Sequence, residues 1–77
     1  MLRVLFLGRL QDAAGGGERA VPAAADIAAL IGGFEPVLAA ELGSPKVRVA
    51  VNGVLAGPQI ALADGDEVAF LPPVSGG

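Results

Sequence analysis

The stretch that most limits how this chain can fold is its end, DGDEVAFLPPVSGG, from Asp64 to Gly77. Asp-Gly-Asp favours a tight turn, because glycine accepts a positive φ and Asp side chains bond nearby backbone. The next residues, Glu67 to Leu71, begin with the polar–apolar alternation of a half-buried strand. Pro72 and Pro73 then remove two backbone donors and favour extended polyproline geometry, so the sheet has to stop there. We therefore predict a domain over residues 1–71 and an extended tail over residues 72–77.

The tail ends in two residues without side chains, Gly76 and Gly77. A carboxylate on Gly77 is open on all sides, and glycine backbone can enter a slot that excludes any Cβ. This suits a carboxylate that is activated inside another protein's active site. An accidental or engineered end is the alternative. Because 12 of the 77 residues are glycine, a terminal pair arises by chance only about 2% of the time, which favours the functional interpretation.

The composition argues against catalysis within the chain. There is no cysteine and no histidine, so disulfides, thiolate metal sites and the usual general base are excluded. The single lysine is Lys46. A hydrophobic fraction of 53% over 77 residues predicts one small globular domain. We expect no bound metal or cofactor and no enzymatic activity of the chain on its own.

The charge and hydropathy pattern limit the classes of partner that the protein can bind. A net charge of −3 argues against nucleic acid and anionic membrane surfaces, which require concentrated positive charge. No apolar run approaches the roughly 20 residues of a spanning helix, and no basic-then-apolar signal peptide is present. We expect a cytoplasmic protein that binds neither nucleic acid nor membrane.

Two strands and a connection are predicted in the first part of the chain. Residues 2–7 are apolar on both faces, which is typical of a central strand or of a strand whose second face meets a partner. Residues 9–17 contain three consecutive glycines and predict a flexible hairpin connection. A phosphate-binding loop is the alternative, but no Gly-Lys-Ser/Thr follows. Residues 18–21 would form the returning strand.

The middle of the chain predicts one broken helix or two short ones. Asp26 has the position of an N-cap, and Gly32-Gly33 stops the first piece. Pro36 suits the first position of a second piece, which Gly43 closes. The apolar residues at helical spacing, which we expect to pack on a sheet, are Ile27, Leu30, Ile31, Phe34, Leu38 and Leu42.

Residues 46–52 alternate as a strand, and Asn52-Gly53 is the strongest hairpin signal in the chain. A short strand around Val54-Leu55 and a loop to Ala63 lead to the last strand. The order β-β-α-β-β-β, with a helical element over a small sheet, predicts an α+β fold consistent with a β-grasp.

Three segments of the chain resemble a known family: Leu62 to Gly77, Ala50-Val51-Asn52-Gly53 and Arg3-Val4-Leu5-Phe6. These residues closely resemble the small, sulfur-carrying subunit of molybdopterin synthase, the MoaD family of the MoaD/ThiS ubiquitin-like proteins. The similarity spans the whole length, but its specific part is the DGDEVAFLPPVSGG ending. The resemblance implies a β-grasp whose first and last strands pair in parallel, a small mixed sheet and a helical element over one face.

The resemblance also implies a function. Gly77 would be adenylated with ATP on an E1-like (MoeB-like) enzyme and then converted to a thiocarboxylate by a sulfur donor. The large (MoaE-like) synthase subunit, in a heterotetramer, would use that sulfur to convert precursor Z, cyclic pyranopterin monophosphate, to the molybdopterin dithiolene. Without cysteine the chain cannot carry sulfur as a persulfide, which leaves the terminal carboxylate. The residues that would enter the partner's active site are Pro72, Pro73, Val74, Ser75, Gly76 and Gly77.

If the first and last strands are neighbours, one face of the sheet has no helix to cover it. We predict that this face docks the partner and is formed by Leu5, Leu7, Ala69, Leu71 and Arg48. Loops or self-association are the alternative cover. Arg3, Lys46 and Arg48 would rim the face and steer acidic partners, or else be ordinary solvated charges.

Three other functions fit the same ending. One is a sulfur carrier for another pathway, such as thiamine thiazole synthesis. The second is a ubiquitin-like modifier whose diglycine forms isopeptide bonds. The third is an interaction module with an inert tail. A carrier leaves a thiocarboxylate, a modifier leaves conjugates of higher mass, and an inert module leaves an unmodified carboxylate.

Overall fold

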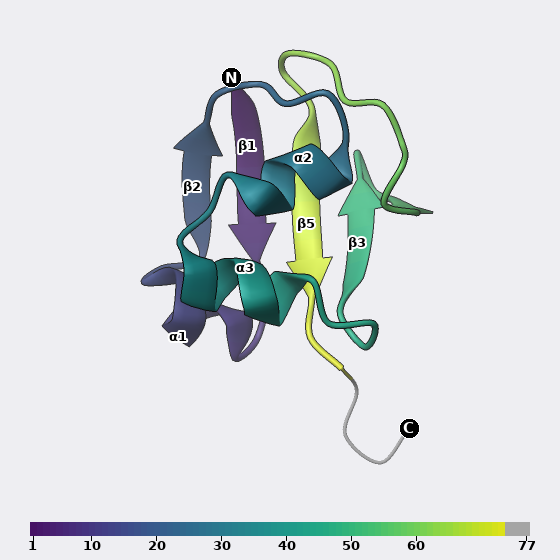
Figure 1. The fold of residues 1–77 in the computed structure, drawn as a ribbon. Coiled ribbons are helices and arrows are strands. Elements are labelled where there is room, and N and C mark those ends of the chain that lie inside the picture. Colours follow the sequence, from purple (N-terminus) through teal and green to yellow (C-terminus); the bar gives the residue numbers. More distant parts are fainter. Residues whose placement is uncertain (74–77) are drawn as a thin grey trace.

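The computed structural model describes residues 1–73, which form a five-stranded sheet and three short helices (Figure 1). The strands are β1 (Leu2–Phe6), β2 (Glu18–Val21), β3 (Arg48–Val51), β4 (Val54–Ala56) and β5 (Glu67–Leu71). The helices are α1 (Leu10–Ala14), α2 (Ile27–Gly32) and α3 (Pro36–Leu42). Within residues 1–73 none of these helices has the length and apolarity needed to cross a membrane.

The strand order is β2-β1-β5-β3-β4, so the first and last strands lie side by side in the middle of the sheet. β1 and β5 pair in parallel, with Val4 opposite Val68 and Phe6 opposite Phe70. The other neighbouring strands pair antiparallel. This mixed sheet with helices on one face confirms the α+β, β-grasp prediction.

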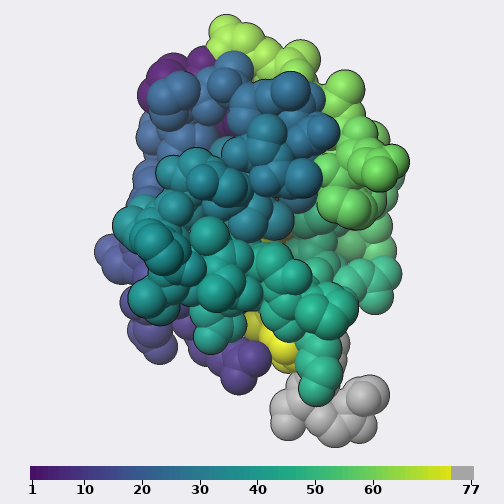
Figure 2. All heavy atoms as spheres, in the orientation of Figure 1, coloured from purple at the N-terminus to yellow at the C-terminus, as the bar shows by residue number. Residues whose placement is uncertain are grey.

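The core lies between the sheet and the helices α2 and α3, which cover one face (Figure 1). In the same orientation, the atoms of the helices and their connections hide most of the sheet (Figure 2). Phe6 and Phe70 stack with ring centroids 6.0 Å apart, and Phe34 meets Phe6 edge-on at 5.8 Å. The buried apolar residues are Leu2, Val4, Phe6, Leu10, Ala14, Ile27, Leu30, Phe34, Leu38, Leu42, Val68 and Phe70.

The local signals in the sequence do what their chemistry predicts. Asp26 is the N-cap of α2, where its Oδ1 accepts a hydrogen bond from the Ala29 amide at 2.8 Å. Pro36 opens α3. Asn52 and Gly53 have φ of 52° and 84°, so they form the two-residue turn whose twist matches the strands of a hairpin. Of the two predicted arrangements of the helical region, the structure has the two short helices, α2 and α3.

The prediction of a flexible connection over residues 9–17 was wrong in its middle, where α1 forms. Leu10 and Ala14, one helical turn apart, are both buried in the core. Five residues are far too few for a helix to be stable alone. Burial of these two side chains therefore holds α1, and the helix ends at Gly15.

Arg19 links three elements at the edge of the core. Its guanidinium donates to the Ala14 carbonyl at 2.6 Å and to Glu35 Oε1 at 2.8 Å. It also lies 5.9 Å from the Phe6 ring centroid and 5.4 Å from that of Phe34. The hydrogen bond from Arg19 lowers the pKa of the Glu35 carboxyl. Arg19 thus ties β2 to the end of α1 and the start of α3 through hydrogen bonds and cation–π contacts.

A second polar cluster fixes the start of β5 against β3. Asp66 accepts from the Ala63 amide at 2.9 Å and from the Asn52 side-chain amide at 3.0 Å. Asn52 in turn accepts from the Glu67 amide at 3.0 Å. The bond from the Ala63 backbone, followed by that from Asn52, lowers the pKa of Asp66. The folded state therefore prefers ionised Asp66.

We predict that Leu38→Ala lowers the free energy of unfolding by about 2–5 kcal/mol, because it leaves a cavity at a side chain that is 1% exposed. The matched control is the neighbouring Val37→Ala on the same helix, since Val37 is 77% exposed. That change should cost less than about 0.5 kcal/mol. Urea unfolding followed by circular dichroism measures both. Equal losses would mean that α3 does not pack as described.

We also predict that the Asp66 cluster contributes to acid unfolding. Because the folded pKa lies below the ordinary value of 3.8, its contribution is complete at neutral pH and is lost as the pH falls through the folded pKa. Asp66→Asn should therefore lose less Tm than the parent between pH 7 and about pH 3. The control is Asp12→Asn, which removes an exposed carboxylate on α1. An unchanged pH profile in Asp66→Asn would contradict this assignment.

Candidate docking face and C-terminal tail

The exit of the tail is set by the position of β5. This strand lies between β1 and β3, so the chain that follows Leu71 leaves from the middle of one end of the sheet (Figure 1). Pro72 and Pro73, the last described residues, are half-buried against the body. Val74, Ser75, Gly76 and Gly77 lie outside the described residues, so their predicted roles in active-site insertion and sulfur attachment remain predictions.

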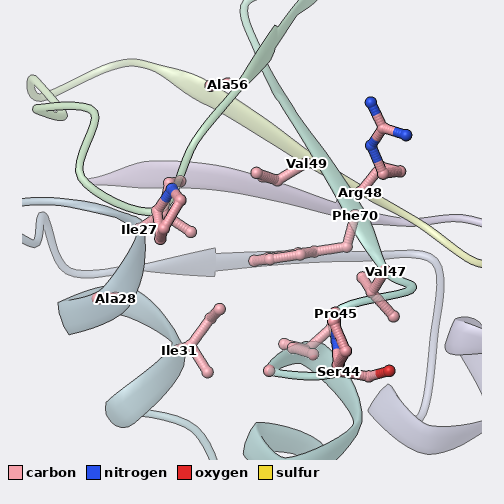
Figure 3. Close-up of a pocket in the computed structure, with 13 residues that line it drawn as sticks. Ile27, Ala28, Ile31, Ser44, Pro45, Val47, Arg48, Val49, Ala56 and Phe70 are labelled. Atoms are coloured by element: carbon pink, nitrogen blue, oxygen red, sulfur yellow. The ribbon is translucent and has the colours of Figure 1, made fainter.

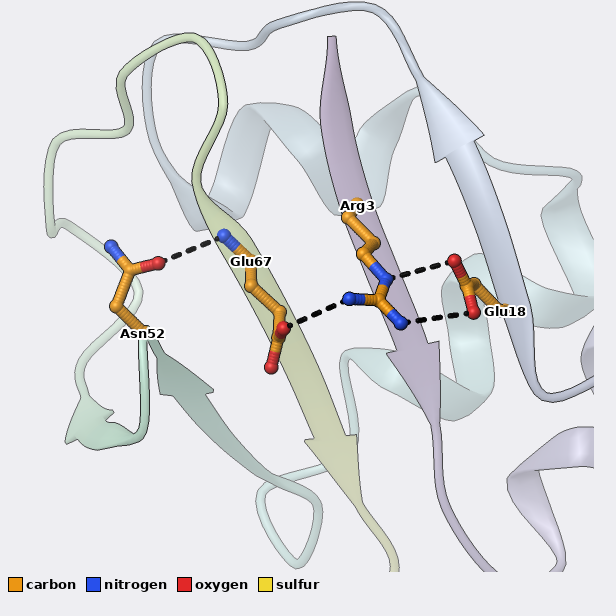
Figure 4. Close-up of polar contacts among 4 residues, drawn as sticks. All are labelled: Arg3, Glu18, Asn52 and Glu67. Atoms are coloured by element: carbon orange, nitrogen blue, oxygen red, sulfur yellow. Dashed lines mark hydrogen bonds and ion pairs between the residues drawn. The ribbon is translucent and has the colours of Figure 1, made fainter.

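The face opposite α2 and α3 carries the apolar residues that the sequence predicts for docking. Leu5, Ala69 and Leu71 are half-buried, and Leu7, just after β1, is 40% exposed. Leu5 lies opposite Ala69 in the register. Within residues 1–73 no helix covers this face, as Figure 4 shows from that side.

The structure extends this apolar row beyond the predicted residues. Ala69 lies opposite Ala50 on β3, which lies opposite Leu55 on β4. Leu55 is 59% exposed. The alternation within residues 46–52 already placed Ala50 on the face away from Val49 and Val51. Leu55 was missed because only the strand register brings it into line. We call Leu5, Ala69, Ala50, Leu55 and Leu71 the open apolar row.

The other end of the same face is polar, and its one basic side chain is paired with two carboxylates. Arg3 Nε donates to Glu18 at 2.8 Å, and its guanidinium lies 3.5 Å from Glu67 (Figure 4). The hydrogen bond and charge of Glu18 raise the pKa of Arg3, and Arg3 lowers the pKa of Glu18 in return. All three side chains are solvent-exposed, so the cluster contributes little to stability. Arg3 is therefore paired with these two carboxylates and is not a free positive charge at the rim of the docking face.

Arg48 is the basic residue next to the apolar part of the face. It lies opposite Leu71 in the register and is exposed. It makes no ion pair with any residue that the structure describes. The structure thus places Arg48 beside Leu71, the last residue of β5. Its role in docking remains a prediction.

A groove of about 490 Å³ lies on the helical side, between α2, the end of α3 and the strands β3 and β4. Ile27, Ile31, Val47, Val49 and Phe70 give it an apolar lining (Figure 3). Arg48 is the one titratable residue along the groove, and its side chain points away from it (Figure 3). The groove therefore offers mainly apolar contact, with the Ser44 hydroxyl at one end, and no carboxylate, histidine, cysteine or lysine is among its lining residues.

Reactive groups are scarce throughout the described part of the chain. Residues 1–73 contain no group of three or more His, Cys, Asp or Glu side chains that could hold a metal ion. Five of the carboxylates are held by a hydrogen bond or an ion pair: Glu18, Asp26, Glu35, Asp66 and Glu67. The arrangement can position a tail beside an apolar face.

Comparison with known proteins agrees with this geometry. The sequence profile of the ThiS family matches residues 4–77. None of the curated proteins compared with the chain matches it. Among solved structures, SAMP1 from Haloferax volcanii is 31% identical with a TM-score of 0.73, over 99% of this chain and 98% of that chain.

Two further solved structures share the fold. The complex of subunits 1 and 2 of the molybdopterin-converting factor from Helicobacter pylori matches at 28% identity and a TM-score of 0.71, over 99% of this chain and 97% of that chain. CysO from Mycobacterium tuberculosis matches at 23% identity and a TM-score of 0.77, over 96% of this chain and 100% of that chain, a likeness of fold alone. With a family profile that covers nearly the whole sequence, the chain belongs to the ThiS family of the MoaD/ThiS ubiquitin-like proteins.

Proposed function

We propose that this protein is a sulfur carrier that acts as the small subunit of molybdopterin synthase. The observation that carries the proposal is the geometry of β5: a central strand runs directly into a Pro-Pro spacer and a diglycine ending, beside an apolar face without helical cover. Membership of the ThiS family supports a sulfur carrier or a ubiquitin-like modifier. The choice between them, and the pathway, belongs to the proposal.

The proposed chemistry takes place at the carboxylate of Gly77. One carboxylate oxygen attacks the α-phosphorus of ATP and pyrophosphate leaves, giving an acyl-adenylate. Hydrosulfide then attacks the acyl carbon, AMP leaves with the transferred oxygen, and a thiocarboxylate and a proton remain. A carboxylate is a poor acyl donor, whereas the acyl-adenylate is a good one because AMP is a good leaving group. Cleavage of ATP therefore supplies the driving force.

The chain itself contributes the tail and the docking face. Without histidine or cysteine it lacks the usual general base and thiol nucleophile. An E1-like (MoeB-like) enzyme would therefore bind ATP, and a separate donor would supply sulfur. A large (MoaE-like) subunit would hold the precursor Z that receives the sulfur. The likeness to a chain in the Helicobacter pylori complex of subunits 1 and 2 supports a partner of this kind, which we propose forms a heterotetramer with this chain.

A second candidate function is protein modification. The 31% identity to SAMP1, whose Haloferax volcanii protein is described as small archaeal modifier protein 1, favours it. In that case the activated Gly77 would form an isopeptide bond with a lysine of another protein, with loss of AMP. The same adenylate is formed in both functions, so the acceptor nucleophile decides between them. Conjugates of higher mass would identify the modifier, and a free thiocarboxylate would identify the carrier.

We predict that the protein gains the mass difference of one oxygen replaced by sulfur when it is incubated with its adenylating enzyme, ATP and sulfide. Intact mass spectrometry measures the gain, and fragmentation should assign it to Gly77. Omitting ATP is the control and should leave the mass unchanged. Deleting Gly77 should abolish the gain while the midpoint of urea unfolding stays the same.

Two results would contradict the carrier function. One is an unchanged mass in the presence of an adenylating enzyme that is active on another carrier. The other is unfolding of the protein that lacks Gly77, because the tail would then support the fold rather than carry sulfur. If a thiocarboxylate forms but the large subunit cannot use it, the protein would instead be a sulfur carrier of another pathway.

We predict that Leu71→Asp weakens binding to the large synthase subunit by about tenfold or more, since a charge would then be desolvated at the interface. The free energy of unfolding should fall by less than about 1 kcal/mol, because Leu71 is only half-buried. The control is Val54→Asp, a 68% exposed residue at the edge of the sheet that lies opposite Val51 on the other face. Calorimetric titration measures the binding of both variants. Equal binding of the two variants would contradict the docking face, and so would an equal loss of stability and affinity in Leu71→Asp.

A further inference from the structure

Gly8 and Pro72 are in close contact, although they lie 64 positions apart in the sequence. An ideal Cβ on Gly8 would lie only 2.9 Å from Pro72 Cγ and 3.8 Å from Cδ. Carbon atoms normally approach to about 3.5–4.0 Å. The Pro72 ring therefore occupies the space that any other residue at position 8 would need.

The backbone around Gly8 is held on both sides. Just before it, the Leu7 amide donates to the Phe70 carbonyl at 3.1 Å and joins the end of β1 to β5. Just after it, the Gly8 carbonyl accepts from the Gln11 amide at 3.2 Å, in the first turn of α1. Leu10, 1% exposed, anchors that turn in the core. Gly8 thus forms a fixed surface against which the Pro72 ring packs.

The contact lies at the point where the tail begins. Pro72 follows β5 directly and its ring fixes φ, so contact on one side of the ring restricts the direction of the chain beyond it. Five residues span at most about 17 Å, so a change of roughly 20° at Pro72 could move the end of the chain by at most roughly 6 Å. Reactions inside an active site lose rate when the reacting atom is misplaced by as little as about 1 Å.

We propose that Gly8 is a positioning residue, which sets the direction in which the tail leaves the domain through its contact with Pro72. The proposal rests on the function proposed above, because the direction matters only if Gly77 has to reach a partner's active site. It assigns to the β1–α1 turn a role that the diglycine ending alone does not have. A residue with any side chain at position 8 would push Pro72 away and redirect the tail.

The test combines three substitutions. Gly8→Ala introduces both the clash with Pro72 and the cost of a side chain at φ +54°. Gly15→Ala is the matched control, because Gly15 has φ +77° but nothing within 4 Å of the added Cβ. Pro72→Ala removes the ring atoms that clash, and combined with Gly8→Ala it completes a double-mutant cycle. Urea unfolding identifies any variant that is not folded.

In thiocarboxylation by the adenylating enzyme, Gly8→Ala should lower kcat/KM about three- to tenfold, mainly through KM, whereas Gly15→Ala should stay within twofold of the parent. In the Pro72→Ala background, Gly8→Ala should cost less than twofold, because the clash is gone. An equal loss with and without the Pro72 ring would overturn the proposal, and so would equal losses in Gly8→Ala and Gly15→Ala.

A second measurement needs no enzyme. Because the chain has no cysteine, Ser75→Cys can carry a single nitroxide label, whose line broadening reports which amides the tail approaches. Gly8→Ala should redistribute the broadening between the open apolar row and the helical face, and Gly15→Ala should not. An unchanged pattern overturns the role of Gly8. A parental protein that is never thiocarboxylated overturns the proposed function instead, so the two failures are distinguishable.

Discussion

The parallel pairing of β1 and β5 is the constraint on which the rest of the structure depends. It places the first and last strands side by side, with Val4, Phe6, Val68 and Phe70 in the centre of the core. A parallel pair needs a crossover connection, and the helices α2 and α3 within that connection pack on one face of the sheet. The same pairing brings the end of β5 next to the turn after β1. The exit of the tail is therefore a consequence of how the core is built.

The two faces of the sheet differ because, within residues 1–73, helices cover only one of them. The helical face takes the aromatic rings, while small or half-buried apolar residues such as Ala50 and Ala69 remain on the open face. At one end of that face, Arg3 is paired with Glu18 and Glu67. At the other end, next to Pro72, the surface is apolar and carries Arg48. The surface that a partner could use is therefore the part nearest to the tail.

Much of this architecture could be predicted from the sequence, because local signals and burial patterns agree there. The Asp26 cap, Pro36 and the Asn52-Gly53 turn each act through their own chemistry, and the alternation in residues 46–52 gives the faces of β3. α1 was missed because three glycines dominate its segment, while the burial that holds Leu10 depends on the whole core. The Gly8–Pro72 contact joins distant residues, so no local pattern predicts it. The parallel pairing itself came from the family resemblance.

The proposed chemistry at the tail has a consequence for the specificity of the protein. If the chemistry at Gly77 is the same in every sulfur carrier, the diglycine cannot tell one acceptor from another. The choice then depends on the surface that meets the partner before the tail reacts. In this protein of net charge −3, Arg48 beside Leu71 presents a positive charge at the border of an apolar patch. A partner with a carboxylate next to an apolar surface would match it, and a partner with a basic residue there would be repelled. The pathway that this protein serves should therefore be decided at the border between Leu71 and Arg48.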